Sequence, residues 1–369
     1  MIYGIWPGVV DADLVSLAPL ACAAEDPAQT LAALRALQGG ARPFYVRAYR
    51  NFGAGAGAAA TPARPELYAG QGRVIDLVAS YRSSLPDPAG FAGFVRQAVR
   101  DVASWGGGKV QVGEELNLPA PLDGGSPGCF EAVGAGVAAA LEERDRLGAP
   151  VLVGVNSAGL ADPGFWGRLT AAIGSGNTRR LDYVGLDAFP DVFRPIPREK
   201  LAGAVAFLLG RFREVTADCG VPAGTPIHLT ETGWPTGDQR TEDAQAAVLA
   251  AVAGAVAASE AGVAAIEWFG LRDGLSAGPW SVRFGILRDD YTAKPAFATL
   301  AGIIAGQAGT RAGQDAGGQD AGGQDSRVGR GLPGATVRAR MPRVARSALS
   351  GTTGQVMASR QFCAIFDQS

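Results

Sequence analysis

Short apolar segments alternate with longer segments of helical periodicity through the first 306 residues of the chain. The short segments have the continuous apolar character of strands that are buried on both faces of a parallel sheet. They are residues 2–6, 44–47, 74–79, 110–113, 151–155, 183–186, 227–230 and 264–269. Because most of them are followed by a helical segment, the pattern predicts a series of strand–helix units.

The predicted helices have recognisable first residues. An aspartate followed by proline supplies an N-cap and a favourable first helical residue, and this pair occurs at residues 26–27, 87–88 and 162–163. Thr241 is expected to cap an alanine-rich helix that ends near Gly262, and Pro295 to begin a last helix that runs through Ile304. The glycine- and proline-rich segment between Arg50 and Arg73 predicts no helix.

Eight such units in 306 residues match the size of a (β/α)8 barrel, or TIM barrel. We therefore expect an α/β fold in which residues 1–306 form one barrel domain. An open, doubly wound sheet is the alternative. Residues 53–58 (GAGAGA) imitate a dinucleotide-binding fingerprint, but Pro62 and Pro65 interrupt the helix that such a site requires. We expect a loop over the barrel mouth there.

The composition changes after Gly306. Residues 312–325 repeat the short motif AGGQD with small variations, and an arginine-rich segment without apolar periodicity follows. Such a sequence cannot bury enough apolar surface to offset its ordering entropy. We expect residues 307–369 to be a disordered tail, either simply solvated or serving as a basic anchor for an acidic partner.

Composition and charge exclude several classes of protein. The chain has 369 residues, of which 47% are hydrophobic and 18% charged, with a formal net charge of −2. This content supports a large core, and the balanced charge argues against a nucleic-acid-binding surface. No apolar run reads as a membrane span. The sequence opens without a leader-like segment, so we expect a cytoplasmic location for the chain as given, or secretion if a leader precedes it.

Histidine and cysteine usage limits the possible chemistry. His228 is the single histidine, and the four cysteines have no metal-binding spacing. A zinc site is therefore not expected, and no G-x-S-x-G motif supplies a serine for a Ser-His-Asp triad. The cysteines fit reduced thiols. We expect no cofactor and no metal, so catalysis must depend mainly on carboxylates. The strand position of His228 predicts a side chain that points away from the side of Glu231.

Two glutamates follow predicted strands at the end of the barrel where TIM-barrel active sites lie. Glu115 comes after the fourth strand and Glu231 after the seventh. Two carboxylates that face each other across a barrel mouth suit cleavage of a glycosidic bond, in which one protonates the leaving oxygen and the other attacks the anomeric carbon. The sequence thus predicts an oligo- or polysaccharide as the substrate.

Several segments resemble one enzyme family. Residues 230–235 (TETGWP) resemble the nucleophile segment of clan A glycoside hydrolases, which are retaining (β/α)8 enzymes, and residues 113–117 (GEELN) are similar to the clan's Gly-Asn-Glu-Pro-Asn motif. Residues 183–190, 266–268, 284–287 and 294–297 resemble its sixth strand, eighth strand and closing segment. Arg47 falls where the clan has an arginine on strand two. The resemblance covers roughly residues 1–306.

The resemblance implies roles for individual residues. It makes Glu115 the general acid/base and Glu231 the nucleophile of a retaining glycosidase. The residues then expected to bind substrate are Arg47, Glu114, Asn156, Asp187, Phe189, Trp234 and Trp268. Trp268 is in the place of the clan's sugar-stacking tryptophan, and Arg47 or Arg50 is expected to contact the nucleophile and keep it ionised.

Glu114 departs from the pattern of this family, which has asparagine at that position. A neighbouring carboxylate would raise the pKa of Glu115 and so suit an acid. The register could instead be displaced by one residue, which would make Glu114 the acid. A third possibility is that activity has been lost, and the chain would then be a non-catalytic carbohydrate-binding barrel.

Overall fold

The computed structural model describes residues 1–53, 60–120 and 122–317. In these residues the strands form one closed parallel barrel whose order around the barrel is their order along the chain. They are β1 (Ile2–Trp6), β2 (Phe44–Phe52), β3 (Arg73–Tyr81), β4 (Gly108–Val112), β5 (Val151–Ala158), β6 (Tyr183–Asp187), β7 (Ile227–Thr232) and β8 (Val263–Phe269). The predicted strands and the TIM barrel are confirmed, and the open sheet is excluded because β1 pairs with β8.

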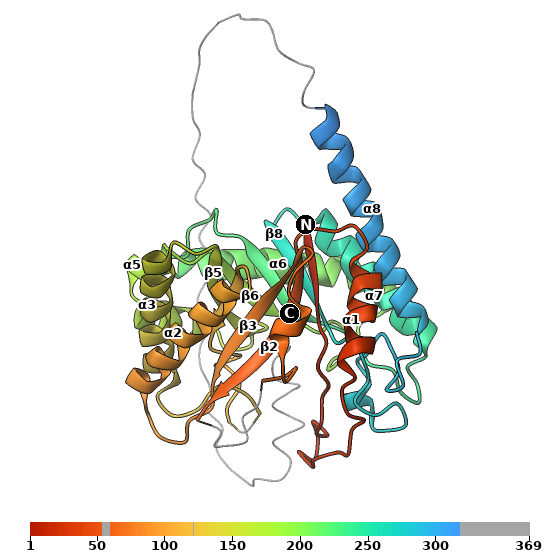
Figure 1. Ribbon diagram of the computed structural model, residues 1–369, viewed down its shortest axis with the longest axis horizontal. Coiled ribbons are helices and arrows are strands. Elements are labelled where there is room, and N and C mark those ends of the chain that lie inside the picture. The colour runs from red at the N-terminus through yellow and green to blue at the C-terminus, as the bar shows by residue number, and fades with distance from the viewer. Residues whose placement is uncertain (54–59, 121, 318–369) are drawn as a thin grey trace, which may run out of the picture.

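Helices surround the barrel (Figure 1). They are α1 (Pro27–Gln38), α2 (Pro88–Ser104), α3 (Cys129–Leu147), α4 (Phe165–Ile173), α5 (Ser175–Thr178), α6 (Arg198–Asp218), α7 (Glu242–Ala258) and α8 (Pro295–Gly317), with 3₁₀ helices η1 (Pro65–Tyr68) and η2 (Trp280–Val282). The sequence predicted no helix between Arg50 and Arg73; the described part of this β2–β3 connection has no α-helix, but it does contain the short 3₁₀ helix η1. None of the described helices combines the length and apolarity needed to cross a membrane.

The predicted helix caps are confirmed at three of four positions. Asp26, Asp87 and Thr241 accept hydrogen bonds from backbone amides in the first turns of α1, α2 and α7. The prediction for Asp162 is wrong, because α4 begins only at Phe165 and Asp162 accepts its hydrogen bond in the preceding turn.

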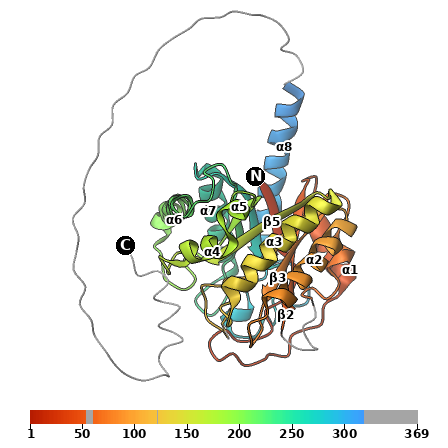
Figure 2. The same ribbon diagram turned by 90° about the vertical axis from the view of Figure 1, so that its left-hand side faces the viewer.

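The last helix extends past the expected domain boundary. α8 continues to Gly317, whereas the sequence predicted a helix that ends at Ile304 and a tail from residue 307. In both views this helix projects beyond the barrel (Figures 1 and 2). From residue 318 on, the expected tail lies outside the described residues, as does most of the expected loop at 53–58. Cys22, Cys129 and Cys219 are free thiols.

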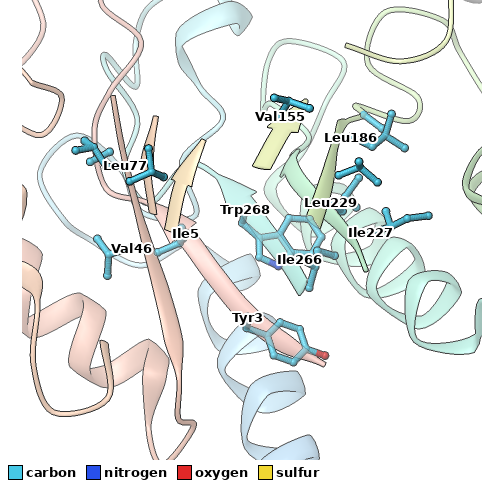
Figure 3. Close-up of a cluster of buried hydrophobic side chains, with 14 of the residues drawn as sticks. Tyr3, Ile5, Val46, Leu77, Val155, Leu186, Ile227, Leu229, Ile266 and Trp268 are labelled. Atoms are coloured by element: carbon cyan, nitrogen blue, oxygen red, sulfur yellow. The ribbon is translucent and has the colours of Figure 1, made fainter. Parts of the chain in front are cut away.

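Alternate side chains of each strand point outward and form the apolar core between sheet and helices. Ile5, Val46, Leu77, Leu186 and Leu229 are each at most 2% exposed. Figure 3 shows them with other members of the same cluster, which come from strands on all sides of the barrel. Burial of this continuous apolar layer is the main driving force for closing the barrel.

The inward-facing positions are polar to an unusual degree, since TIM-barrel interiors are commonly filled by branched apolar residues. Buried inward residues include Tyr45, Arg47, Asp76, Lys109, Gln111, Asn156, Tyr183, His228 and Glu267. Charges so deeply buried are tolerated only when they are paired. Lys109 accordingly contacts Asp76 at 3.1 Å and Glu267 at 2.5 Å. A Cβ atom added to Gly4 would lie 2.8 Å from Glu267 Cγ, so only glycine fits beside this network.

His228 does not point away from the side of Glu231, and that prediction is wrong. Its ring lies in the barrel interior, stacked on Tyr183 with centroids 4.3 Å apart. The pairing of β7 with β6 shifts register after Leu186, so the strict alternation on which the prediction depended is broken before Glu231. Burial and the nearby Lys109 hold the pKa of His228 well below its usual value, which makes it a neutral core residue.

Candidate active site

A cleft of about 780 Å³, including space open to solvent, lies at the C-terminal ends of the strands. Its lining residues follow or end β1, β4, β5, β6, β7 and β8. Glu115 and Glu231 both line it, together with Asp123 and Asp187. The two glutamates that the sequence singled out are therefore brought together at the end of the barrel where active sites of this fold lie.

Glu231 is held by two residues of β2. The Tyr49 hydroxyl donates a hydrogen bond to Oε1 of Glu231, and Nη2 of Arg47 lies 3.4 Å from the same oxygen. Burial keeps the pKa of Tyr49 well above its usual value, so the phenol remains a donor. Arg47, rather than Arg50, thus fulfils the predicted contact with this glutamate; Arg50 pairs with Asp101.

The expectation that Arg47 keeps Glu231 ionised is only partly met. Burial and the negative charge of Glu114 raise the pKa of Glu231 to about 7, against the opposing effect of Arg47. The arginine is shared: its shortest ion pair, 2.7 Å, is with Asp76, and it also contacts Glu114 at 3.3 Å. Because one guanidinium serves three carboxylates, it neutralises none of them completely.

Glu114 is a buried carboxylate with several donors around it. Its side chain contacts Arg47, accepts from Nε2 of Gln111 at 2.5 Å and accepts from Nδ2 of Asn156 at 3.1 Å. Burial raises its pKa, and Arg47 partly offsets that effect. Only 2% of Glu114 is exposed, and it does not line the cleft. It lies beneath the site, surrounded by donors.

Glu115 has a different environment from its neighbour. Its backbone adopts a positive φ of 38°, which turns the side chain to the cleft, and its amide donates to Oδ1 of Asn156 at 3.0 Å. Among the described residues its carboxyl group makes no ion pair or side-chain hydrogen bond. Burial, followed by repulsion from Asp123, Asp187 and Glu231, holds its pKa well above the usual value. These surroundings favour the protonated form of the side chain.

Asn156 and Asp187 support the two glutamates. Nδ2 of Asn156 donates to Asp187 as well as to Glu114, and Thr230 donates to Oδ1 of Asp187 at 2.6 Å. Burial and the charges of Glu231 and Glu114 hold the pKa of Asp187 well above its usual value. Asp187 lines the cleft, whereas Asn156 acts from behind it.

Three aromatic residues were predicted to bind substrate, and their positions differ. Phe189 lines the cleft. Trp234 is 7% exposed and donates from Nε1 to Asp191, and it does not line the cleft. Trp268 is 4% exposed and belongs to the outward-facing core (Figure 3). Because side chains alternate along β8, Phe269 rather than Trp268 reaches the cleft.

The sequence reasoning missed other residues of the site. Tyr49 is two residues after Arg47 on β2, so strand periodicity could have placed both on one face. Phe269 likewise lies two residues after the inward-facing Glu267 on β8, so the same periodicity could have placed it on the inner face. Asp123 had no such signal, because it lies on the long connection between β4 and α3. It pairs with Arg82 at 2.8 Å, and burial raises its pKa to about 6.

One group of carboxylates is close enough to share a cation. Ligand oxygens of Glu114, Glu115 and Asp187 lie within 4.8 Å of one another. Such an oxygen-only set would suit a hard cation such as Mg²⁺ or Ca²⁺. The amide nitrogen of Asn156 already donates to Glu114 and Asp187, however, and so stabilises two of these groups without an ion.

No protein-family model matches the sequence, and no curated protein matches it either. The fold is similar to solved glycoside hydrolase structures of the clan A type. A structure of fungal β-1,4-galactanases has a TM-score of 0.54 and 13% identity, over 82% of this chain and 99% of that one. These similarities establish a shared barrel fold.

Two further structures carry sugars. An active-site mutant of Rhizomucor miehei β-1,3-glucanosyltransferase in complex with laminaritriose has a TM-score of 0.52 and 16% identity, over 80% of this chain and 96% of that one. A Streptomyces cattleya protein of family GH5_18 in complex with GlcNAc has a TM-score of 0.53 and 16% identity, over 76% of this chain and 74% of that one.

Proposed function

We propose that the protein is a retaining glycoside hydrolase in which Glu231 is the nucleophile and Glu115 the general acid/base. The observation that carries this proposal is the pair itself: two carboxyl groups from the ends of β4 and β7 line one cleft and have contrasting partners. Glu231 is bound by a guanidinium and a phenol, whereas Glu115 is surrounded by negative charge. Two carboxyl groups whose surroundings favour ionisation of one and protonation of the other can act as the nucleophile and the acid.

The surroundings of Glu114 support Glu115 as the acid. An acid must reach the leaving oxygen of the substrate, and Glu115 lines the cleft while Glu114 lies below it. The donors around Glu114 also leave it poorly suited to give up a proton to substrate. Its negative charge instead contributes to the raised pKa of Glu115, which is the effect expected of a neighbouring carboxylate.

The reaction then proceeds by two displacements. An oxygen of ionised Glu231 attacks the anomeric carbon, the bond from that carbon to the leaving oxygen breaks, and Glu115 gives that oxygen its proton. A water molecule next gives a proton to the Glu115 carboxylate and attacks the anomeric carbon, which breaks the ester to Glu231 and restores both groups. This mechanism requires carboxyl groups about 5–5.5 Å apart.

The fold comparisons support this proposal by analogy, since the matched structures include β-1,4-galactanases and proteins bound to sugars. A panel of aryl glycosides, disaccharides and soluble polysaccharides tests it. Glu115→Gln should lower kcat for unactivated substrates by about 10²–10⁴-fold, the usual contribution of general acid–base catalysis. Glu231→Gln should abolish turnover. Glu199→Gln, at an exposed position of α6, is the matched control.

Azide rescue distinguishes the two roles. With Glu231→Ala and an activated aryl glycoside, azide should attack in place of the nucleophile and give a glycosyl azide of inverted configuration. With Glu115→Ala it should intercept the glycosyl–enzyme and give the retained configuration. Full activity of Glu231→Gln would overturn the proposal, and sugar binding without turnover by the wild-type protein would favour a non-catalytic carbohydrate-binding barrel.

A further inference from the structure

The walls of the cleft are almost entirely apolar. Within the described residues, the polar side chains that line it are four carboxyl groups: Glu115, Asp123, Asp187 and Glu231. The other lining residues are phenylalanine, leucine, valine, alanine and glycine. The polar groups of the lining are therefore confined to the proposed reaction centre and its immediate neighbours.

One wall is a cluster of phenylalanines from the ends of β6 and β8 and the loops that follow. The ring centroids of Phe189, Phe269 and Phe284 lie 5.6–5.7 Å apart in edge-to-face pairs. Phe193 extends this wall and lies 6.1 Å from Phe189. Leucines from the loop after β4 also line the cleft, among them Leu122, whose side chain is partly exposed.

This distribution limits what the substrate can present. Carboxyl groups can pair with the hydroxyl groups of one sugar ring. A second sugar against the apolar walls would leave hydroxyl groups without partners, at a cost of about 1–3 kcal/mol for each buried group. The tryptophans Trp6, Trp234 and Trp268 offer no alternative platform in this cleft, since none of them lines it.

We propose that the cleft takes a glycoside of one sugar with an apolar aglycone, an alkyl or aryl group that packs against the phenylalanine wall. This proposal rests on the proposed glycosidase activity and specifies its substrate class. The sugar hydroxyls face the four carboxyl groups, and the aglycone displaces water from the apolar walls.

A series of alkyl glycosides tests the aglycone directly. For the sugar that the glycoside panel identifies, methyl, butyl and hexyl glycosides have leaving alcohols of similar acidity, so differences in kcat/KM report contact and not leaving ability. Burial of a methylene group increases affinity by about fourfold at most. We expect kcat/KM to increase at least tenfold from methyl to hexyl, and the hexyl glycoside to exceed the disaccharide of the same sugar.

Variants of lining residues test whether the dependence of kcat/KM on alkyl chain length arises in the cleft. Phe193→Ser and Leu122→Ser should each reduce the hexyl-to-methyl ratio of kcat/KM, because the hexyl group loses apolar contact with the wall of the cleft. Phe207→Ser, at a position of α6 that is 65% exposed and does not line the cleft, is the matched control and should leave the ratio unchanged.

The outcomes separate this inference from the proposed activity. If kcat/KM does not increase from methyl to hexyl, or if the disaccharide is hydrolysed better than the hexyl glycoside, the inference of an apolar aglycone is wrong, although the protein is still a glycosidase. Absence of turnover with every alkyl glycoside, disaccharide and polysaccharide would overturn both.

Discussion

Nη1 of Arg47 lies 2.7 Å from Oδ2 of Asp76, and this contact is shorter than those of the same guanidinium with Glu114 and Glu231. Both partners are at most 1% exposed. The carboxyl group of Asp76 therefore sets the position of Arg47 and takes up part of its charge. It is a positioning residue for the proposed nucleophile, although it does not reach the cleft itself.

Replacement of Asp76 tests this relationship. In Asp76→Asn the charge of Arg47 becomes more available to Glu231, whose pKa of about 7 should fall. The acidic limb of the kcat/KM profile, which reports ionisation of the nucleophile, should then move to lower pH. Asp101→Asn, which removes the partner of the neighbouring Arg50, is the control and should not move it. An acidic limb that stays in place would contradict the assignment.

The charge of Glu114 should affect both the acidic and the alkaline limb of the pH profile of kcat/KM. Its charge contributes to the raised pKa of Glu231 and, less strongly, to that of Glu115. In Glu114→Asn we expect turnover to persist and both limbs to move to lower pH, because repulsion on the nucleophile and on the acid is relieved. If Glu114→Asn abolishes activity while Glu115→Gln does not, Glu114 is the acid.

The strands and the two catalytic candidates could be predicted because their signals are local. Buried parallel strands need continuous apolar runs, and TIM-barrel sites lie at strand ends, which singles out Glu115 and Glu231. The resemblance to clan A enzymes placed Arg47, and the structure shows that it contacts Glu231.

Other features depend on geometry that the sequence does not reveal. The shift of register between β6 and β7 falls after His228 and before Glu231, so simple alternation does not relate the sides on which these two residues lie. The partners that distinguish Glu114 from Glu115, such as Gln111 and Asn156, come from separate strands, and the hydrogen bonds exist only once the barrel has closed.

Stability should decrease as pH increases from about 5 to 8. Burial raises the pKa of Glu231 from 4.5 to about 7 and that of Glu267 from 4.5 to about 8. In this window the folded state binds more protons than the unfolded state, so rising pH favours unfolding, by on the order of 1–3 kcal/mol per group. Thermal melting should therefore give a higher Tm at pH 5 than at pH 8. Glu231→Gln should make this dependence shallower, and a Tm that increases toward pH 8 would refute the explanation.

The last prediction concerns Gly185, which lies on β6 between the residues that hold the site together. A Cβ atom there would lie 2.8 Å from Cβ of Asn156 and 2.8 Å from Oγ1 of Thr230. Overpacking of this kind costs about 1–3 kcal/mol. Because Asn156 positions Glu115 and Thr230 binds Asp187, Gly185→Ala should also lower kcat.

Gly203 provides the matched comparison for that substitution. It lies on α6, and a Cβ atom added there meets nothing within 4 Å. Gly203→Ala should stabilise the protein by about 0.5–1 kcal/mol, as expected for alanine in place of glycine within a helix, and leave kcat unchanged. Urea unfolding and steady-state kinetics measure both variants. If Gly185→Ala matches the wild type in stability and kcat, the packing of Asn156 and Thr230 around Gly185 does not position the carboxyl groups, and the support proposed for Glu115 has to be sought elsewhere.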